Sequence, residues 1–379
     1  MNIAFITSEY PHLRTGTSGG IGTSIKNLAS SLVKASHGVH VVVIGQKEDA
    51  TFSDNGITIH QLKNRKWKGL SWWLTAKKIE KKINQLCQEE SIELVEVQDY
   101  LGILAFVSCY CKTVLKLHGS DTYFCHLDKR PVKWWNKFQE KRAFKKADAI
   151  VAVSQFAGDL SNLVFSSNRQ FEVIGNGIDS NQFVPAPPNS NNTIMYFGTL
   201  IRKKGVLELA AIFNKVYAQD PTAILILAGR DTADITTGAT STWEVMQPLF
   251  TKQARQNVRY KGEIPYSEIK KEIATATVCV FPSLSETFGM VTIEAMACSK
   301  PVITSNFGWT NEIIIHEKEG FLIDPKNHKV FAATLLRLLQ DPVLQKEIGT
   351  NARIKIEESF TNEIIAQKTI AFYKKIIVE

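Results

Sequence analysis

The sequence predicts an α/β protein built from two doubly wound parallel sheets. Its 379 residues suffice for two domains of roughly 100–200 residues each. With 44% hydrophobic and 22% charged residues, its composition is that of a globular protein, which excludes a disordered, collagenous or coiled-coil chain. Short, continuous apolar runs alternate with helical stretches, and continuous runs are typical of strands buried on both faces.

The expected strands fall into two groups along the chain. The first group comprises 2–8, 39–45, 57–62, 94–99, 113–119, 149–154 and 171–177, and the second comprises 193–198, 223–229, 258–262, 278–283, 301–305 and 320–324. The Pro- and Asn-rich segment 181–192 separates them and is the predicted linker. We therefore expect one domain over 1–185 and another over 193–360. The last helix, within 361–379, could cap the second domain or cross back to the first, to which we assign it.

The cysteine spacing, the length of the apolar runs and the first ten residues argue against several classes of protein. The six cysteines form no CxxC pair, and Cys109-x-Cys111 has no second pair to complete a zinc site, so we expect free thiols. No run approaches the ~18 consecutive apolar residues of a membrane span. The first residues, MNIAFITSEY, lack the basic and apolar regions of a signal peptide and are typical of a first buried strand. We expect a cytoplasmic protein.

Two Rossmann-like units in tandem would face each other across a central cleft at the carboxyl ends of their strands. Ligands of open α/β sheets bind at such ends, so the chemistry is expected on loops that follow strands. In the first half, Gly19, Gly20 and Gly22 precede a helix, where backbone N–H groups can approach an anion. The dinucleotide fingerprint would need a glycine in place of Ile25, so a nicotinamide cofactor is not supported and a plain flexible turn remains the alternative.

Polar and charged residues follow two further strands. His118 and Gly119 end one strand, either at the cleft or as part of a helix cap with Ser120 and Asp121. In the second half, Arg202, Lys203 and Lys204 lie between a strand and a helix. Cations beside a helix start suit a phosphate, although a solvated run of charges is the alternative.

The most specific pattern is a pair of glutamates with seven residues between them. Glu286 lies on the loop after a strand, and Glu294 lies on a helix that is expected to begin near Gly289. The first N–H groups of that helix would face the cleft, and the carboxylate of Glu294 can accept two sugar hydroxyls. A helix N-terminus and two carboxylates suit a ligand with both phosphates and hydroxyls, such as a sugar nucleotide.

With these residues placed, nearly the whole chain resembles the retaining glycosyltransferases of the GT-B fold, often called family 4. The similarity rests on the E-x7-E motif Glu286-TFGMVTI-Glu294 and the EAMACSKPVITSNFGWTNEII segment that begins at its second glutamate. The GGIG loop, the His118-Gly119 strand end, the NGID turn at 176–179 and Lys204-Gly205 are also similar. The chain departs from the family pattern at 198–200, 229–231 and 307–309, where it has Gly-Thr-Leu, Gly-Arg-Asp and Phe-Gly-Trp.

The resemblance implies a nucleotide-sugar donor, a UDP- or GDP-sugar, held by the second domain and an acceptor held by the first. It implies that Glu294 binds the ribose hydroxyls and that Glu286 binds the donor hexose. Lys204, with Arg202, would neutralise the diphosphate, and His118 would lie beside the reacting carbon. Backbone N–H groups would contact the sugar and the diphosphate at Phe288, Gly289, Met290 and Val291, and Gly19 and Gly20 would approach the diphosphate.

The resemblance also implies a reaction in which a hexosyl unit passes to a hydroxyl acceptor with retained configuration. The chain has no Asp-x-Asp, a common metal-carrying motif, so we expect no metal and no other cofactor. The alternatives are another GT-B enzyme, such as a sugar-nucleotide epimerase, and a non-catalytic nucleotide-sugar-binding protein. The E-x7-E segment argues against the first.

The charge of +8 is concentrated in two Trp-containing segments of the first domain. Segments 63–82 and 129–146 each hold eight Lys or Arg against one Glu. Cations interleaved with tryptophan suit an anionic membrane surface, which predicts peripheral association at the inner face of the membrane and a sugar or lipid-linked acceptor. An ordinary solvated face, partly core-facing at helical spacing, is the alternative. Nucleic acid is not expected, because no binding module accompanies the charge.

Overall fold

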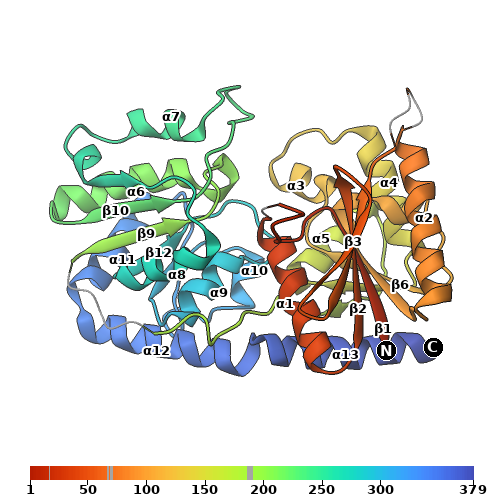
Figure 1. Cartoon of the computed structure of the whole chain (residues 1–379). Coiled ribbons are helices and arrows are strands. Elements are labelled where there is room, and N and C mark those ends of the chain that lie inside the picture. Colours follow the sequence, from red (N-terminus) through yellow and green to blue (C-terminus); the bar gives the residue numbers. More distant parts are fainter. Residues whose placement is uncertain (17, 66–67, 69–70, 186–190) are drawn as a thin grey trace. The chain divides into compact units, whose positions relative to one another are not determined.

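The computed structural model describes residues 1–16, 18–65, 68, 71–185 and 191–379 (Figure 1). The chain divides into two compact units. The first comprises Met1–Ile178 with Asn362–Glu379, and the second comprises Asp179–Thr361. Residues 186–190 of the predicted linker lie outside the described part. All six cysteines are free, as expected. In the described part of the chain, no helix has the length and apolar character needed to cross a bilayer.

The first unit is built on an eight-stranded sheet. Its order is β3 (Ala50–Asp54), β4 (Ile57–Lys63), β2 (Gly38–Gln46), β1 (Asn2–Thr7), β5 (Leu94–Gln98), β6 (Lys112–Leu117), β7 (Ala149–Ala152) and β8 (Glu172–Val173). Every pairing is parallel except that of β3 with β4. Strand β3 was not predicted, because its residues are exposed and half-buried in alternation rather than forming a continuous apolar run.

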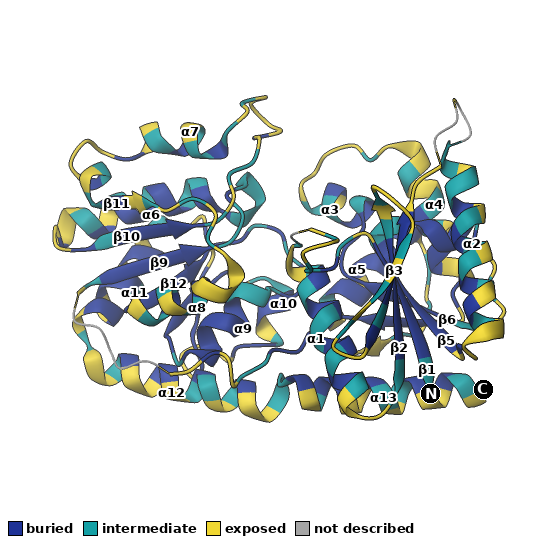
Figure 2. Cartoon of the chain, viewed as in Figure 1, coloured by how far each residue is buried: buried dark blue, intermediate teal, exposed yellow. Residues whose placement is uncertain are grey.

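Both faces of this sheet are covered, which explains the continuous apolar runs. Alternate residues of β1 point to opposite faces: Ile3 and Phe5 belong to one core, and Ala4 and Ile6 to the other. The core of Ile3 and Phe5 includes residues of α1 (Gly20–Lys34) and α13 (Asn362–Val378), whereas the other includes residues of α2 (Ser71–Glu89), α4 (Trp134–Lys146) and α5 (Gln155–Phe165). The buried strands are dark blue in Figure 2. The last helix therefore packs on the first unit.

The second unit is built on a six-stranded parallel sheet. Its order is β11 (Val258–Tyr260), β10 (Ile224–Ala228), β9 (Thr193–Phe197), β12 (Val278–Phe281), β13 (Val302–Thr304) and β14 (Phe321–Leu322). Its helices are α6 (Val206–Gln219), α7 (Thr242–Met246), α8 (Tyr266–Thr275), α9 (Met290–Ala297), α10 (Gly308–Asn311), α11 (His328–Gln340) and α12 (Pro342–Ser359). The predicted α/β class with two parallel sheets is confirmed.

The strand orders place a switch point in each sheet. In the first unit the chain goes from β1 outward through β2 to one edge, then returns to β5 and proceeds to the other edge. In the second unit the corresponding reversal separates β9 from β12. Helices that diverge from such a reversal leave a crevice at the carboxyl ends of the two strands, where ligands of doubly wound sheets bind. The loops after β1 and β5, and after β9 and β12, are therefore the places to examine.

Candidate active site

The loop after β9 and the loop after β12 meet at the switch point of the second unit. The first loop contains a short 3-10 turn, Arg202–Lys204, followed by Gly205 and helix α6. The backbone N–H groups of Leu284 and Ser285, on the second loop, both donate to the carbonyl oxygen of Lys203. The two loops thus form one backbone-bonded unit at the predicted site.

Gly205 allows this close approach. Its φ of 69° is in the left-handed region, and a Cβ at this position would overlap the carbonyl oxygen of Pro282, at the end of β12. Only glycine tolerates both conditions without strain. The glycine therefore brings the Arg202–Lys204 turn against the strand end and the Lys204 side chain to the Glu286 loop.

Lys204 and Glu286 form an ion pair across these loops. Burial, with a smaller contribution from the neighbouring charge of Lys203, lowers the pKa of the Lys204 ammonium to about 7. Glu286 favours the charged form of Lys204, as a bound anion would. The half-buried Lys204 ammonium beside the Glu286 carboxylate can therefore neutralise phosphate while the carboxylate accepts a hydroxyl, and the structure brings these two predicted residues together.

Helix α9 begins in the same loop. Its N-cap, Gly289, has a φ of 91° and offers no capping side chain, and Gly289, Met290 and Val291 are partly exposed. Phe288, just before the cap, is buried against the ring of Phe360. The N–H groups and partial positive charge at a helix N-terminus favour anions. The predicted helix start near Gly289 is confirmed.

Glu294 lies on α9, in its second turn, and only 5% of the residue is exposed. The hydroxyl of Tyr266, the first residue of α8, donates to its Oε1 atom at 2.9 Å. Burial raises the pKa of Glu294 to about 7. A carboxylate oxygen has further acceptor capacity, so Glu294 can accept hydroxyl donors in addition to Tyr266.

Arg202 has a different environment from Lys204. Its Nε and one terminal nitrogen donate to the two carboxylate oxygens of Asp234 at 2.8 and 2.6 Å, and Asp234 is 1% exposed. The Arg202 guanidinium and the hydroxyl of Thr237 hold the pKa of Asp234 below its usual range. The guanidinium therefore anchors the loop after β10. The structure does not place it in the Lys204–Glu286 pair.

In the first unit, the predicted glycine loop donates a backbone hydrogen bond to a carboxylate of the protein itself. The backbone N–H of Gly19, the N-cap of α1, donates to Oε2 of Glu9 at 2.8 Å. Gly19 and Gly20 are exposed. The carboxylate of Glu9 thus lies where the N-terminus of α1 attracts negative charge.

His118 follows β6 and is buried, with burial holding the pKa of its imidazole well below the usual value. Its backbone N–H and that of Gly119 both donate to the carboxylate of Asp99, each at 3.0 Å. Asp99 begins the turn after β5, and burial raises its pKa to about 7. The next residue, Tyr100, has its hydroxyl 3.1 Å from the hydroxyl of Ser8, after β1. These contacts join the ends of three adjacent strands.

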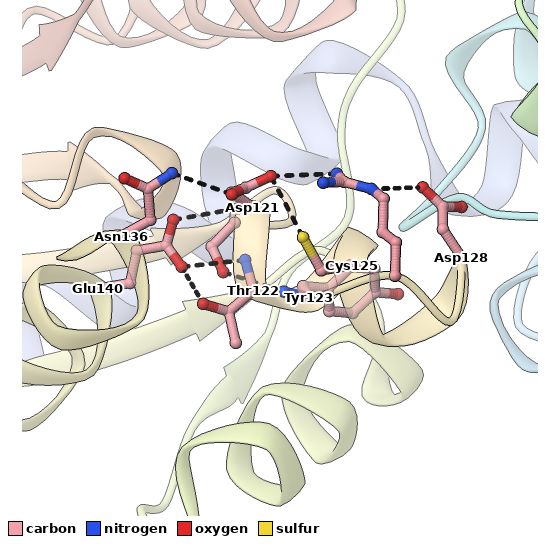
Figure 3. A network of polar contacts seen from close by, with 9 residues as sticks. Asp121, Thr122, Tyr123, Cys125, Asp128, Asn136 and Glu140 are labelled. Atoms are coloured by element: carbon pink, nitrogen blue, oxygen red, sulfur yellow. Dashed lines mark hydrogen bonds and ion pairs between the residues drawn. The ribbon is translucent and has the colours of Figure 1, made fainter. Parts of the chain in front are cut away.

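Helix α3 (Asp121–Leu127) begins directly after the His118 turn and is capped by α4 (Figure 3). The buried carboxylate of Glu140 accepts the N–H groups of Asp121 and Thr122 at 3.1 and 3.0 Å. Asn136, also on α4, donates to the carboxylate of Asp121 at 2.9 Å. The helix cap at Ser120, which the sequence left as an alternative for this segment, is present, because its hydroxyl accepts the N–H of Tyr123. Helix α4 therefore fixes the segment that follows His118.

Sequence reasoning missed the partners of the predicted residues. Asp99 ends the expected strand 94–99 and could have been found as a carboxylate at a strand end. Four other partners could not be found from sequence, because each lies on a different element from the residue that it binds. They are Glu9, Tyr266, Asp234 and Glu140. Among the residues that the structure describes, no group of three or more His, Cys, Asp or Glu side chains could hold a metal ion.

Comparison with known proteins agrees with this geometry. Residues 18–182 match the family model "Glycosyltransferase Family 4", and residues 177–355 match "Glycosyl transferases group 1". The chain is 26% identical to alpha-maltose-1-phosphate synthase of Mycolicibacterium smegmatis, over 99% of this chain and 100% of the relative.

Two solved structures have the same fold over the whole chain. Sucrose-phosphate synthase of Thermosynechococcus elongatus has a TM-score of 0.80 at 21% identity and covers 100% of both chains. HepE of Anabaena, solved with UDP-glucose, has a TM-score of 0.77 at 20% identity and covers 99% of this chain and 100% of its own. Together, the two family matches and the two parallel sheets establish that the chain has the GT-B fold and belongs to the group 1, family 4-like glycosyltransferases.

Proposed function

We propose that this glycosyltransferase moves a hexosyl unit from a UDP- or GDP-sugar to a hydroxyl acceptor with retention of configuration. The observation that carries the proposal is the Lys204–Glu286 ion pair on the loop that leads into α9, the helix that carries Glu294. A cation and a helix N-terminus suit a diphosphate, and the two carboxylates suit the hydroxyls of a sugar and a ribose. The second unit would hold the donor, and the first would hold the acceptor.

In the proposed reaction, the bond between the anomeric carbon and the diphosphate oxygen breaks, and its electron pair goes to that oxygen. The acceptor hydroxyl oxygen bonds to the anomeric carbon on the same face, and its proton passes to the departing phosphate oxygen. Lys204 and the N–H groups at 288–291 would stabilise the negative charge that develops on the leaving group. His118 would lie beside the sugar, with Gly19 and Gly20 near the diphosphate.

We propose that the reaction needs no metal or other cofactor, since fixed cationic and dipolar groups can supply the charge stabilisation. Lys204 is already held beside a carboxylate in a half-buried position, so little reorganisation is needed when a diphosphate arrives. Arg202 would contribute indirectly by holding the loop that carries Lys204.

A thermal-shift screen of UDP, GDP and ADP with their hexose conjugates tests donor binding. At 100-fold excess over Kd, a ligand adds about 2.7 kcal/mol to the free energy of unfolding, which is readily detected. We expect stabilisation by a UDP- or GDP-sugar and slow release of the nucleoside diphosphate from that donor. A protein that is stabilised by none of these compounds and hydrolyses none would contradict the proposal.

The proposal extends to the cellular setting of the enzyme. We propose that it works in the cytoplasm at the inner face of the membrane, on a sugar or lipid-linked acceptor, in the assembly of a surface polysaccharide or glycolipid. The basic, Trp-containing segments 63–82 and 129–146 support this setting through their charge. Within them, residues 66–67 and 69–70 lie outside the described part of the chain.

A further inference from the structure

Helix α4 presents three large aromatic side chains to solvent. Trp134 is 74% exposed, and Trp135 and Phe138 are each 40% exposed. Their rings form one continuous group, with the centroid of Phe138 lying 5.7 Å from that of Trp134 and 5.6 Å from that of Trp135. We call Trp134, Trp135 and Phe138 the aromatic ledge. Contiguous exposed apolar groups of this size on a soluble protein mark an interaction site.

The ledge has a fixed base. Trp135 packs against Phe106, with ring centroids 6.0 Å apart, and edge-on against Trp72 of α2 at 5.4 Å. Phe106 and Trp72 are half-buried. The underlying contacts hold the ledge on the rigid body of the first unit, so its exposed surface is preorganised for a partner.

Cations surround the ledge. Lys141, Arg142 and Lys145 each follow a ledge residue by seven positions, so they lie on the same face of α4 two turns further on. Lys133 and Lys137 are exposed beside it. Within 129–146, all of which the structure describes, the single carboxylate is that of Glu140, and it is buried. The exposed charge of this segment is therefore entirely positive.

We infer that the aromatic ledge and its surrounding lysines dock the first unit on an anionic lipid bilayer. Tryptophan rings partition into the interfacial layer, and lysines around them bind anionic headgroups. An acidic protein would complement the charge, but it would not require three aromatic side chains to be exposed in the unbound state. The inference deepens the proposed function, on which it rests for its membrane setting, and it assigns the contact to one helix.

Of the two basic segments, the second provides the contact surface. In the first, Trp72 contributes to the base of the ledge, Ala76 and Ile79 belong to the core, and Trp73 is 48% exposed. Lys78 of the same helix is paired with Asp49. The core-facing interpretation therefore holds for Ala76 and Ile79 of segment 63–82, whereas α4 presents a contiguous group of three aromatic side chains to solvent.

The docking helix is also the helix that caps the turn after His118. Glu140 and Asn136 of α4 bind the first residues of α3, as Figure 3 shows, and α3 follows His118 directly. Hydrogen bonds therefore connect α4, which carries the aromatic ledge, to the start of α3, directly after the His118 turn. Docking through α4 would fix the orientation of the His118 turn relative to the bilayer, which suits an acceptor carried by a lipid.

Sedimentation with phosphatidylcholine vesicles, with and without phosphatidylglycerol, tests the inference on the full-length protein. We expect binding to the anionic vesicles that weakens at high salt. Replacing Lys137, Lys141 and Lys145 by Gln should weaken it about 100-fold, since each cation contributes roughly fivefold. The double variant Trp134→Ala, Phe138→Ala should weaken it about tenfold or more.

Matched variants in the second unit serve as controls. The triple variant Lys271→Gln, Lys329→Gln, Lys346→Gln changes the net charge equally, and Ile235→Ala removes an exposed apolar side chain. Both should bind vesicles as the wild type does. Equal recovery of the wild type with neutral and anionic vesicles would overturn the inference, as would unchanged binding by both the triple lysine variant and the double aromatic variant of α4.

Donor hydrolysis in solution separates this inference from the proposed function. Both α4 variants should hydrolyse the donor at the wild-type rate, because none of the substituted residues lies among the proposed donor groups. A protein that hydrolyses the donor but does not bind anionic vesicles would contradict the proposed docking surface and leave the proposed function intact. Protein that binds vesicles through α4 but neither binds nor turns over any nucleotide sugar would contradict the proposed function alone.

Discussion

Lys204 and Glu286 form an ion pair that connects the loop after β9 with the loop after β12. Their backbones are joined as well, through the carbonyl oxygen of Lys203. The two strands are neighbours in the sheet but are separated in sequence by β10 and β11. The ion pair thus lies at the switch point of the second unit, where a cation and a carboxylate can act on adjacent parts of one ligand.

Replacing Lys204 by Ala should lower turnover of the true donor by about 10- to 150-fold, because a charge-assisted hydrogen bond contributes roughly 1.5–3 kcal/mol. Steady-state kinetics with the donor found in the ligand screen would measure this loss. Lys215→Ala, on the exposed surface of α6, is the matched control and should leave turnover unchanged. Wild-type kinetics for Lys204→Ala would remove this lysine from the site.

Glu294→Ala should weaken donor binding by a similar factor of about 10 to 150, since the ribose hydroxyls would lose a charged acceptor. Calorimetric titration of the donor and of the free nucleoside diphosphate would show the loss for both ligands. The variant Tyr266→Phe keeps the carboxylate and removes one donor to it, so its affinity should change much less. Undiminished nucleotide affinity in Glu294→Ala would contradict the ribose assignment.

The raised pKa of Glu294 makes stability depend on pH. In the folded protein this pKa is about 7, against an ordinary value of 4.5. The neutral buried carboxyl therefore makes its full contribution to the free energy of unfolding below pH 4.5, and this contribution is lost as the pH rises through 7. Glu294→Gln, which cannot ionise, should be more stable than the wild type at pH 8 by up to about 3 kcal/mol, and this difference should shrink as the pH falls toward 4.5.

Chemical denaturation of the ligand-free protein between pH 5 and 8 measures this effect. The difference between the variant and the wild type is the relevant quantity, because other groups, including Asp99 with its raised pKa, titrate equally in both. A difference that stays constant across this range would show that Glu294 is ionised throughout.

The fold could be predicted because buried parallel strands have a local signature. Residues 3–6 are apolar in succession, since Phe5 faces one core and Ile6 the other. Strand β3 lies at the edge of its sheet and lacks that signature. Its assignment depends on antiparallel pairing with β4, a contact that no composition rule identifies.

The site could be predicted only where spacing reflects one element or one loop. The seven residues between Glu286 and Glu294 span a loop and the first turns of α9, so their sequence fixes their placement. Arg202 and Lys204 look equivalent in sequence, but in the structure Arg202 forms an ion pair with Asp234 and Lys204 forms one with Glu286. That distinction depends on where the loop after β10 lies, which is a tertiary property.

Transfer should proceed without a divalent metal if, as proposed, Lys204 and the N-terminus of α9 stabilise the departing diphosphate. Activity measured in excess EDTA should equal activity after magnesium or manganese is added back. Complete loss in EDTA with recovery on adding either metal would contradict the proposed stabilisation of the leaving group by fixed protein charges.

Gly205→Ala should disrupt the site through the backbone alone. The new Cβ would overlap the carbonyl oxygen of Pro282, so the Arg202–Lys204 turn must move away from the end of β12. Gly238 provides a matched control, because its φ of 76° resembles the 69° of Gly205 but a Cβ there would meet nothing within 4 Å. Gly238→Ala should therefore lower the free energy of unfolding only by the left-handed backbone strain of about 1–2 kcal/mol and should keep full activity.

Gly205→Ala should lose more stability than Gly238→Ala, because the steric overlap adds to the same strain. It should also lose donor affinity as Lys204 moves away from Glu286. Denaturation and donor titration of the two variants measure both effects, and equal behaviour of the two would show that the close approach at Pro282 does not position Lys204.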